Sequence, residues 1–192
     1  MFVIKSEILE IERKYSSYKG EWGIFIDLVR SKSPHRELEV DGPDTYYQKD
    51  NVILRWRMGP DISELTIKSR YSLSTSLIRE ESEISLSNNK PRHVMTFLNR
   101  LGFKKLFRIR KNCHMFWIKN DIGEACIVIY KVTSRNQEEK YFIEIEAKKG
   151  LSIAESKELI RYWEKELNLP THRRMNQTLF EIYSGQITRL VD

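Results

Sequence analysis

The sequence predicts an α+β fold built on an antiparallel β-sheet or barrel, and two observations carry this prediction. Several segments alternate charged and apolar residues with a period of two, which is the spacing of a β-strand. Short polar turns rich in Gly, Pro, Asn and Asp separate these segments, as they do between antiparallel strands. No repeat, linker or change of composition divides the chain, so we expect a single domain over residues 1–192.

The expected elements follow one another along the chain. The period of two predicts strands over 7–15, 36–48, 52–58, 64–70, 78–86, 104–119, 124–133 and 140–148. Helical spacing of apolar residues predicts helices over 16–31, 90–101, 153–167 and 176–183. Pro91 suits the first turn of the second helix, and Gly102 is placed to end it.

Composition and charge narrow the function classes. The chain is 40% hydrophobic and 31% charged, which is typical of a globular protein. No apolar run reaches the length of a membrane helix, and no secretory signal is visible at the start, so we expect a cytoplasmic protein. The cysteines Cys113 and Cys126 are expected to be free, buried thiols. A net charge of +6 indicates an anionic partner, such as a phosphate compound or a nucleic acid.

The most informative stretch is Glu10-Ile11-Glu12-Arg13-Lys14, near the start of the first expected strand. In an extended strand its two acids and its lysine share one face, with Ile11 on the other. The same pattern returns in the segment 143–148, with Glu144 and Glu146 on one face. These strands therefore invert the usual sheet: we expect the charged face to point inward and the apolar face to pack outward under helices.

When the charged residues are grouped by face, the face expected to point inward, the lumen of the barrel, carries both positive and negative charges. The bases are Lys14, Arg55, Arg57, Lys68, Arg79, Arg108 and Arg110, and the acids are Glu10, Glu12, Glu81, Glu83, Glu144 and Glu146. Arginine offers forked donors that match phosphate oxygens, and lysine offers a point charge. Clustered carboxylates are the hard oxygen ligands that Mg²⁺ or Mn²⁺ prefers. The pattern therefore predicts a site for a chain of phosphates together with a divalent cation.

These motifs, in this order, resemble the CYTH superfamily, the triphosphate tunnel metalloenzymes, which includes class IV adenylyl cyclases and thiamine triphosphatases. The resemblance runs from about residue 7 to about residue 183 and rests on seven segments: the E-x-E-x-K strand 10–14, D-T-Y-Y at 44–47, L-R-x-R at 54–57, L-T-x-K at 65–68, R-x-E-x-E at 79–83, L-G-F at 101–103 and E-I-E at 144–146. Each segment alone is a weak signal, but their order is specific.

The resemblance implies an eight-stranded antiparallel β-barrel, the triphosphate tunnel, flanked by helices. It implies that Glu10, Glu12, Glu144 and Glu146 hold Mg²⁺ or Mn²⁺, that Lys14, Arg55, Arg57, Lys68 and Arg79 bind phosphate, and that Glu81 and Glu83 support them. Glu10, Glu12, Lys14 and Arg55 would form the catalytic set.

Two positions depart from the family pattern. The family carries a metal-binding Asp in the strand before E-I-E, where this chain has Tyr130. The family also has a K-x-R strand after L-G-F. Counting from Phe103 points to Lys111 and Cys113. Alternation instead indicates Arg108 and Arg110, because their neighbours are apolar, and we predict that these two arginines line the lumen.

The resemblance implies metal-dependent hydrolysis of a triphosphate: tripolyphosphate, a nucleoside or thiamine triphosphate, or an RNA 5′-triphosphate end. The alternatives are a lyase of the adenylyl cyclase type and a non-catalytic triphosphate-binding protein, which Tyr130 favours. General nucleic-acid binding would instead need a basic outer face. We expect no membrane partner, and the oligomeric state stays open, with a homodimer among the alternatives.

Overall fold

The computed structural model describes residues 3–59, 62–68, 78–86, 91–148 and 150–188, and it describes the side chains of these residues except those of 3–10, 68, 78–81 and 185–188. The strands are β1 (Val3–Ser17), β2 (Arg36–Lys49), β3 (Val52–Met58), β4 (Ser63–Lys68), β5 (Ile78–Ser85), β6 (Lys104–Lys119), β7 (Glu124–Thr133), β8 (Glu139–Ala147) and β9 (Arg174–Met175). The helices are α1 (Lys19–Arg30), α2 (Pro91–Arg100), α3 (Ile153–Glu166), a 3₁₀ turn η1 (Thr171–Arg173) and α4 (Leu179–Thr188).

Eight of the strands form a ring. Their order is β5-β4-β3-β2-β6-β7-β8-β1, and β1 also pairs with β5. The N-terminal part of β1 pairs with β5 and its C-terminal part with β8, and every one of these pairings is antiparallel. The short β9 adds to β1 at Lys14 and Tyr15. The predicted antiparallel barrel of eight strands is confirmed.

The element boundaries agree with the expected ones at most places. The strand bounds 104–119 and 124–133 are as predicted. The last helix, expected over 176–183, begins at Leu179 instead. The Thr178 hydroxyl accepts a hydrogen bond from the Glu181 backbone N–H, and the Glu181 carboxylate accepts one from the Thr178 backbone N–H. This capping box ends the preceding extended segment and sets the start of α4.

Two glycines are required by the backbone. Gly102 ends α2 with φ = +85°, a left-handed conformation that glycine adopts without steric cost. Gly42 lies in β2 against the end of β3, where a Cβ atom would stand 1.7 Å from the carbonyl oxygen of Met58. A larger residue at 42 would therefore separate the two strands.

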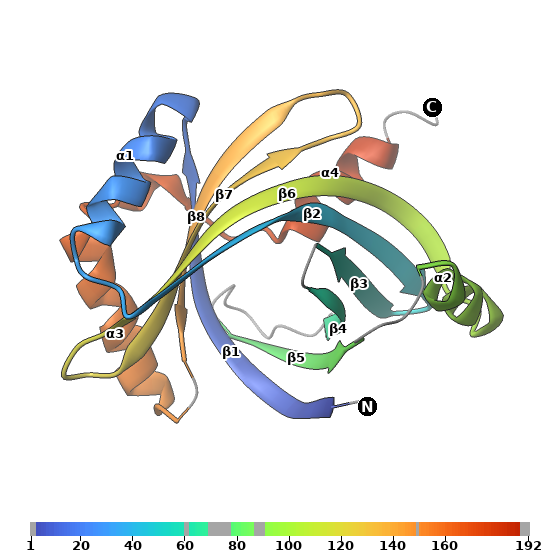
Figure 1. The fold of residues 1–192 in the computed structure, drawn as a ribbon, viewed down its shortest axis with the longest axis horizontal. Coiled ribbons are helices and arrows are strands. Elements are labelled where there is room, and N and C mark those ends of the chain that lie inside the picture. Colours follow the sequence, from blue (N-terminus) through green and yellow to red (C-terminus); the bar gives the residue numbers. More distant parts are fainter. Residues whose placement is uncertain (1–2, 60–61, 69–77, 87–90, 149, 189–192) are drawn as a thin grey trace.

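Helices α1 and α3 cover the outer face of the sheet (Figure 1). Ile26 and Val29 of α1, with Leu159, Ile160 and Trp163 of α3, pack in one cluster against the apolar side chains of β1, β6, β7 and β8. Each fully buried aliphatic side chain in such a cluster contributes about 1.5–3 kcal/mol. The predicted outward packing of the apolar face is confirmed here, because Ile11, Ile143 and Ile145 all belong to this cluster.

The other two helices lie elsewhere. Val94 and Leu98 of α2 pack with Trp56 at the far end of β2 and β6. Helix α4 crosses behind β6 in Figure 1, and its Leu179 and Tyr183 pack in one cluster with Phe107 and Ile109 of β6. None of the described helices is long and apolar enough to cross a membrane.

Candidate functional site

The first and last charged motifs face each other across two neighbouring strands. The register of β1 and β8 pairs Glu12 with Glu146 and Lys14 with Glu144. Directly paired residues of antiparallel strands project from the same face, with Cβ atoms about 4.5–5.5 Å apart. Glu12 and Lys14 are buried, at 6% and 3% exposure. The structure therefore brings four of the predicted site residues together on the inner face.

A second group of charges comes from β2, β3 and β4. The Arg57 guanidinium donates two hydrogen bonds of 2.9 Å to the carboxylate of Asp44, which is fully buried. Arg55 donates a 2.8 Å hydrogen bond to the Thr66 hydroxyl and lies 3.4 Å from the Glu64 carboxylate. The two arginines share one face, as alternation predicts.

Burial raises the pKa of Asp44, but the charge and hydrogen bonds of Arg57 outweigh this effect and lower the pKa to about 2. The charges of Arg55 and Lys111 act in the same direction, so Asp44 is ionised at neutral pH. A paired, hydrogen-bonded guanidinium in a buried position has little freedom to move. Arg57 is thus held in place by its pairing with Asp44.

Glu144 is at the centre of a buried network. Its carboxylate lies 3.0 Å from the Lys14 ammonium and 3.9 Å from the Lys111 ammonium. It also accepts a 2.7 Å hydrogen bond from the Tyr130 hydroxyl. Burial raises the pKa of Glu144, but the two lysines and the hydroxyl together lower it well below its usual range. The burial and the Glu144 charge raise the pKa of Tyr130, which therefore stays a hydrogen-bond donor.

Lys111 completes this network from β6. Its ammonium lies 3.6 Å from the centre of the Tyr130 ring, a cation–π contact. The Lys111 and Arg57 charges both lower the pKa of the Cys113 thiol, against the larger opposing effect of its burial. Charges from both groups therefore act on Cys113, which lies in the inner cluster.

The structure contradicts the predicted placement of Arg108 and Arg110. Both are exposed, and Arg110 is paired with Asp41 on the outer face at 2.7 Å. The inner residues of this stretch of β6 are Phe107, Ile109, Lys111 and Cys113, which is the register that counting from Phe103 gives. We therefore withdraw the two arginines as phosphate ligands.

The physical reason lies in α4. Phe107 and Ile109 belong to the same cluster as Leu179 and Tyr183 of α4, so this part of the inner face is apolar. Alternation identifies two faces but does not say which one is inside when a helix packs within the barrel. Trp117, further along β6, packs against the same inner cluster.

Four predicted site residues have side chains outside the described part of the structure: Glu10, Lys68, Arg79 and Glu81. Their backbones are placed, with Glu10 paired to Arg79 and Lys68 paired to Glu81. Glu83 is half-buried and pairs with Thr66, beside the Arg55 site.

The residues fit a divalent cation only in part. Among the side chains that the structure describes, no three His, Cys, Asp or Glu residues form a metal-binding group. Glu144 does not fit, because two ammonium groups and a hydroxyl already surround its oxygens. The cross-strand pair Glu12 and Glu146 fits better, although Glu146 also lies 2.7 Å from Lys148. Mg²⁺ commonly uses one or two carboxylates and takes its other ligands from water and substrate phosphates.

Sequence reasoning missed three features of this site. Alternation favours Arg108 and Arg110 over Lys111, although counting from Phe103 points to Lys111. Asp44 lay within the D-T-Y-Y segment without an assigned role. Tyr130 was identified as a missing Asp, whereas the structure shows its hydroxyl bound to Glu144. Only the pairing of β6, β7 and β8 brings Tyr130 and Lys111 to Glu144.

Replacing Tyr130 with Phe should remove the hydroxyl from Glu144 and keep the ring. A lost buried hydrogen bond to a charged acceptor costs about 1.5–3 kcal/mol, so the free energy of unfolding at pH 7 should fall by about this amount. Chemical denaturation measures it. Tyr141→Phe is the control, because its hydroxyl contacts Glu139 in a more exposed position. An unchanged unfolding free energy for Tyr130→Phe would mean that the network contributes no stability.

Comparison with known proteins supports the fold. No protein-family model and no curated protein matches the chain. The PH1012 protein of Pyrococcus horikoshii superposes with a TM-score of 0.70 at 19% identity, covering 90% of this chain and 98% of that one. A proposed adenylate cyclase from Bacillus halodurans has a TM-score of 0.62 at 17% identity, covering 93% and 99%. Another from Vibrio parahaemolyticus has a TM-score of 0.66 at 15% identity, covering 92% and 98%. The chain therefore shares the fold of these proteins.

Proposed function

We propose that the tunnel binds a small molecule that carries a triphosphate and hydrolyses its terminal phosphoanhydride bond. The observation that carries this proposal is the convergence of Lys14, Arg55, Arg57 and Lys111 on the inner face, each of them held in position by a polar or ionic contact. Cations held in position before binding stabilise phosphate oxygens without further reorganisation.

In the proposed reaction, water adds to the terminal phosphorus and the bond from that phosphorus to its bridging oxygen breaks. Orthophosphate and a diphosphate leave. Lys14 and Arg55 would contact the non-bridging oxygens and stabilise their charge in the transition state. Asp44 and Glu144 would keep Arg57 and Lys14 oriented. Glu12 and Glu146, with Glu10, would hold Mg²⁺ or Mn²⁺. That ion would lower the pKa of a bound water and neutralise phosphate charge.

A phosphate-release assay tests this proposal. Purified protein is incubated with tripolyphosphate, ATP or thiamine triphosphate, with Mg²⁺, with Mn²⁺ or with a chelator. We expect phosphate release that requires a divalent cation. Glu12→Gln should lower the rate at least about 100-fold, because metal stabilisation of the transition state is worth several kcal/mol. Glu39→Gln, on the exposed outer side of β2, should leave the rate unchanged.

A second candidate is a protein that binds triphosphates without turning them over. The occupied surroundings of Glu144 support it, because they leave fewer carboxylates for metal. Tight tripolyphosphate binding without phosphate release under either metal would favour this candidate and contradict the hydrolase. Release of pyrophosphate together with a cyclic nucleotide would instead indicate the lyase reaction.

A further inference from the structure

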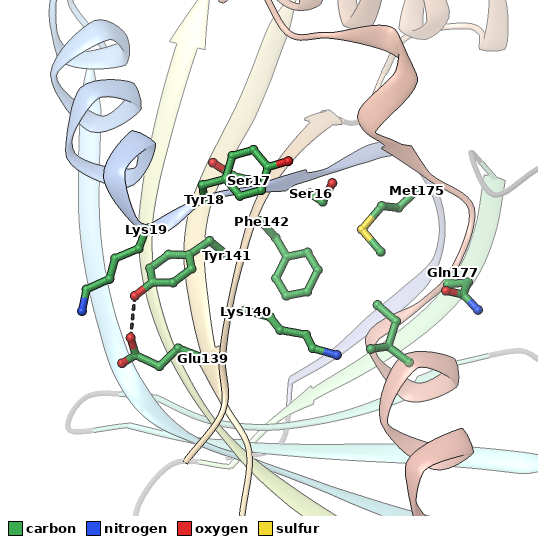
Figure 2. Close-up of a pocket in the computed structure, with 11 residues that line it drawn as sticks. Ser16, Ser17, Tyr18, Lys19, Glu139, Lys140, Tyr141, Phe142, Met175 and Gln177 are labelled. Carbon is green, nitrogen blue, oxygen red and sulfur yellow. Dashed lines mark hydrogen bonds between the residues drawn. The ribbon is translucent and has the colours of Figure 1, made fainter. Parts of the chain in front are cut away.

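The pocket between the ends of β1 and β8 and the segment from β9 into α4 adjoins the charged site (Figure 2). Its lining residue Gln177 accepts a 3.5 Å hydrogen bond from the Lys14 ammonium through its backbone carbonyl. This pocket therefore belongs to the site already described. A different charged surface lies on α2 and the first residues of β6. Helix α2 is at one end of the long axis of the molecule, and α1 and α3 are at the other end (Figure 1).

The exposed residues between 92 and 108 form this surface, here called the α2 surface, and several of them are apolar. Phe97 is 58% exposed and Leu101 is 45% exposed, and Met95 and Leu106 are exposed as well. Phe97 and Leu101 are four residues apart on the helix, so they lie on the same side of it. Single exposed apolar residues are common, but several on one surface indicate a region that contacts another body.

The same surface is strongly basic. Residues 84–120 contain nine Lys and Arg residues and no Asp or Glu, although the whole chain has 27 acidic residues. Five of these bases belong to the α2 surface and are exposed: Arg92, Arg100, Lys104, Lys105 and Arg108. None of the five forms an ion pair with a carboxylate that the structure describes. The turn after β2 adds one further exposed base and one acid, Lys49 and Asp50.

Contacts place these bases beside the apolar side chains. Lys105 pairs with Tyr47 across β6 and β2, and the Tyr47 side chain packs under α2. Burial raises the pKa of Tyr47 and the charge of Arg108 opposes this effect, so the Arg108 guanidinium also lies near Tyr47. On the helix itself, Arg100 follows Phe97 by three residues, the spacing of neighbouring side chains. The apolar side chains and the bases therefore share one surface.

From this arrangement we infer that the α2 surface binds the anionic surface of a lipid bilayer. Phe97 and Leu101 enter the headgroup region, and the surrounding bases contact lipid phosphates. Lysine and arginine suit this position, because their aliphatic stems lie along apolar surface while their charged groups reach the phosphates. Peripheral binding requires no spanning segment, so the short apolar runs of the sequence do not exclude it. This binding is separate from the proposed triphosphate site.

The geometry favours a bilayer over a peptide. The main apolar stripe of α2, with Val94 and Leu98, is already buried against the barrel, so no second stripe is left for a partner helix. Residues 104–109 of β6 extend beyond the pairing with β7, which begins at Arg110. Lysines on such a strand edge oppose the addition of another strand. A bilayer needs only apolar side chains and bases that project together from one end of the molecule.

Cosedimentation of the full chain with large unilamellar vesicles tests the inference. Vesicles of phosphatidylcholine alone are compared with vesicles that also contain about 30% phosphatidylglycerol. We expect the anionic vesicles to bind at least about tenfold more tightly, and we expect about 1 M NaCl to abolish the difference by screening. Equal binding to the two kinds of vesicle, or no binding to the anionic ones, would overturn the inference.

A double charge reversal tests the location. Arg100→Glu with Lys105→Glu should weaken binding to the anionic vesicles at least about tenfold. The matched control is Arg161→Glu with Lys165→Glu, which makes the same change in net charge at exposed positions of α3 and should bind like the wild type. An equal loss in both double variants would mean that net charge, not the α2 surface, determines binding, and would overturn the inference.

Two further comparisons separate insertion from charge and the α2 surface from the tunnel. Phe97→Ser should weaken vesicle binding about fivefold to tenfold, whereas Ile24→Ser, at an exposed position of α1, should not change it. Lys111→Met, which alters the inner face, should leave vesicle binding unchanged. Loss of vesicle binding in Lys111→Met, or binding of a single-stranded oligonucleotide without any binding of vesicles, would contradict the assignment of a lipid surface to α2.

Discussion

Replacing Lys111 with Met should weaken tripolyphosphate binding by about 10-fold to 100-fold, whereas replacing its neighbour Arg110 with Met should leave binding unchanged. A charge-assisted contact in a buried site is worth about 1.5–3 kcal/mol, which corresponds to this range. Lys111 is 6% exposed and faces Glu144 and the Tyr130 ring, while Arg110 lies on the outer face with Asp41. These two adjacent residues of β6 therefore lie on opposite faces, Lys111 on the inner face and Arg110 on the outer one.

Calorimetric titration with tripolyphosphate measures this difference, and a thermal melt of each variant checks that the fold is retained. Methionine keeps most of the lysine stem, so the Lys111 variant should pack in the same space. Glu144 keeps Lys14 and the Tyr130 hydroxyl as partners in this variant. Equal loss of affinity in both variants, or loss in Arg110→Met alone, would contradict the assignment of Lys111 to the site.

Replacing Asp44 with Asn should lower the free energy of unfolding by about 3–5 kcal/mol. The change leaves the largely buried Arg57 guanidinium, at 13% exposure, without its carboxylate, and an uncompensated charge in such a position carries this cost. Asp41→Asn is the matched control. Asp41 lies on the same strand as Asp44, and its replacement breaks only the exposed pair with Arg110 of β6. Exposed pairs contribute little to stability, so this variant should unfold close to the wild type.

The same pair predicts the behaviour of the protein in acid. The pKa of Asp44 falls from 3.8 to about 2 on folding, so its contribution is complete above about pH 4 and is lost as the pH falls through about 2. This lowering of the pKa corresponds to about 2–3 kcal/mol of the free energy of unfolding. Between pH 5 and pH 2 the wild type should lose more stability than Asp44→Asn, as measured by urea denaturation. Parallel acid dependence of the two proteins would show that Asp44 is not the titrating group.

The sequence by itself determined the strands of the barrel and one wall of the site. Alternation in β1 and β8 identified the inner face correctly because their other face, with Ile11, Ile143 and Ile145, is covered by α1 and α3. One face of these strands is apolar and the other charged, so only one orientation buries the apolar side chains. The pairing of Glu12 with Glu146 and of Lys14 with Glu144 then follows from the register.

Only the tertiary structure decided the orientation of β6. Both faces of this strand carry apolar residues, with Phe116 and Ile118 in the outer cluster and Phe107 and Ile109 against α4. Burial of either face is favourable, so a period of two could not tell inside from outside. The packing of α4 within the barrel places Lys111 on the inner face and Arg110 in solvent. The partners of Glu144 come from three further strands, and no local pattern in the chain records that they meet.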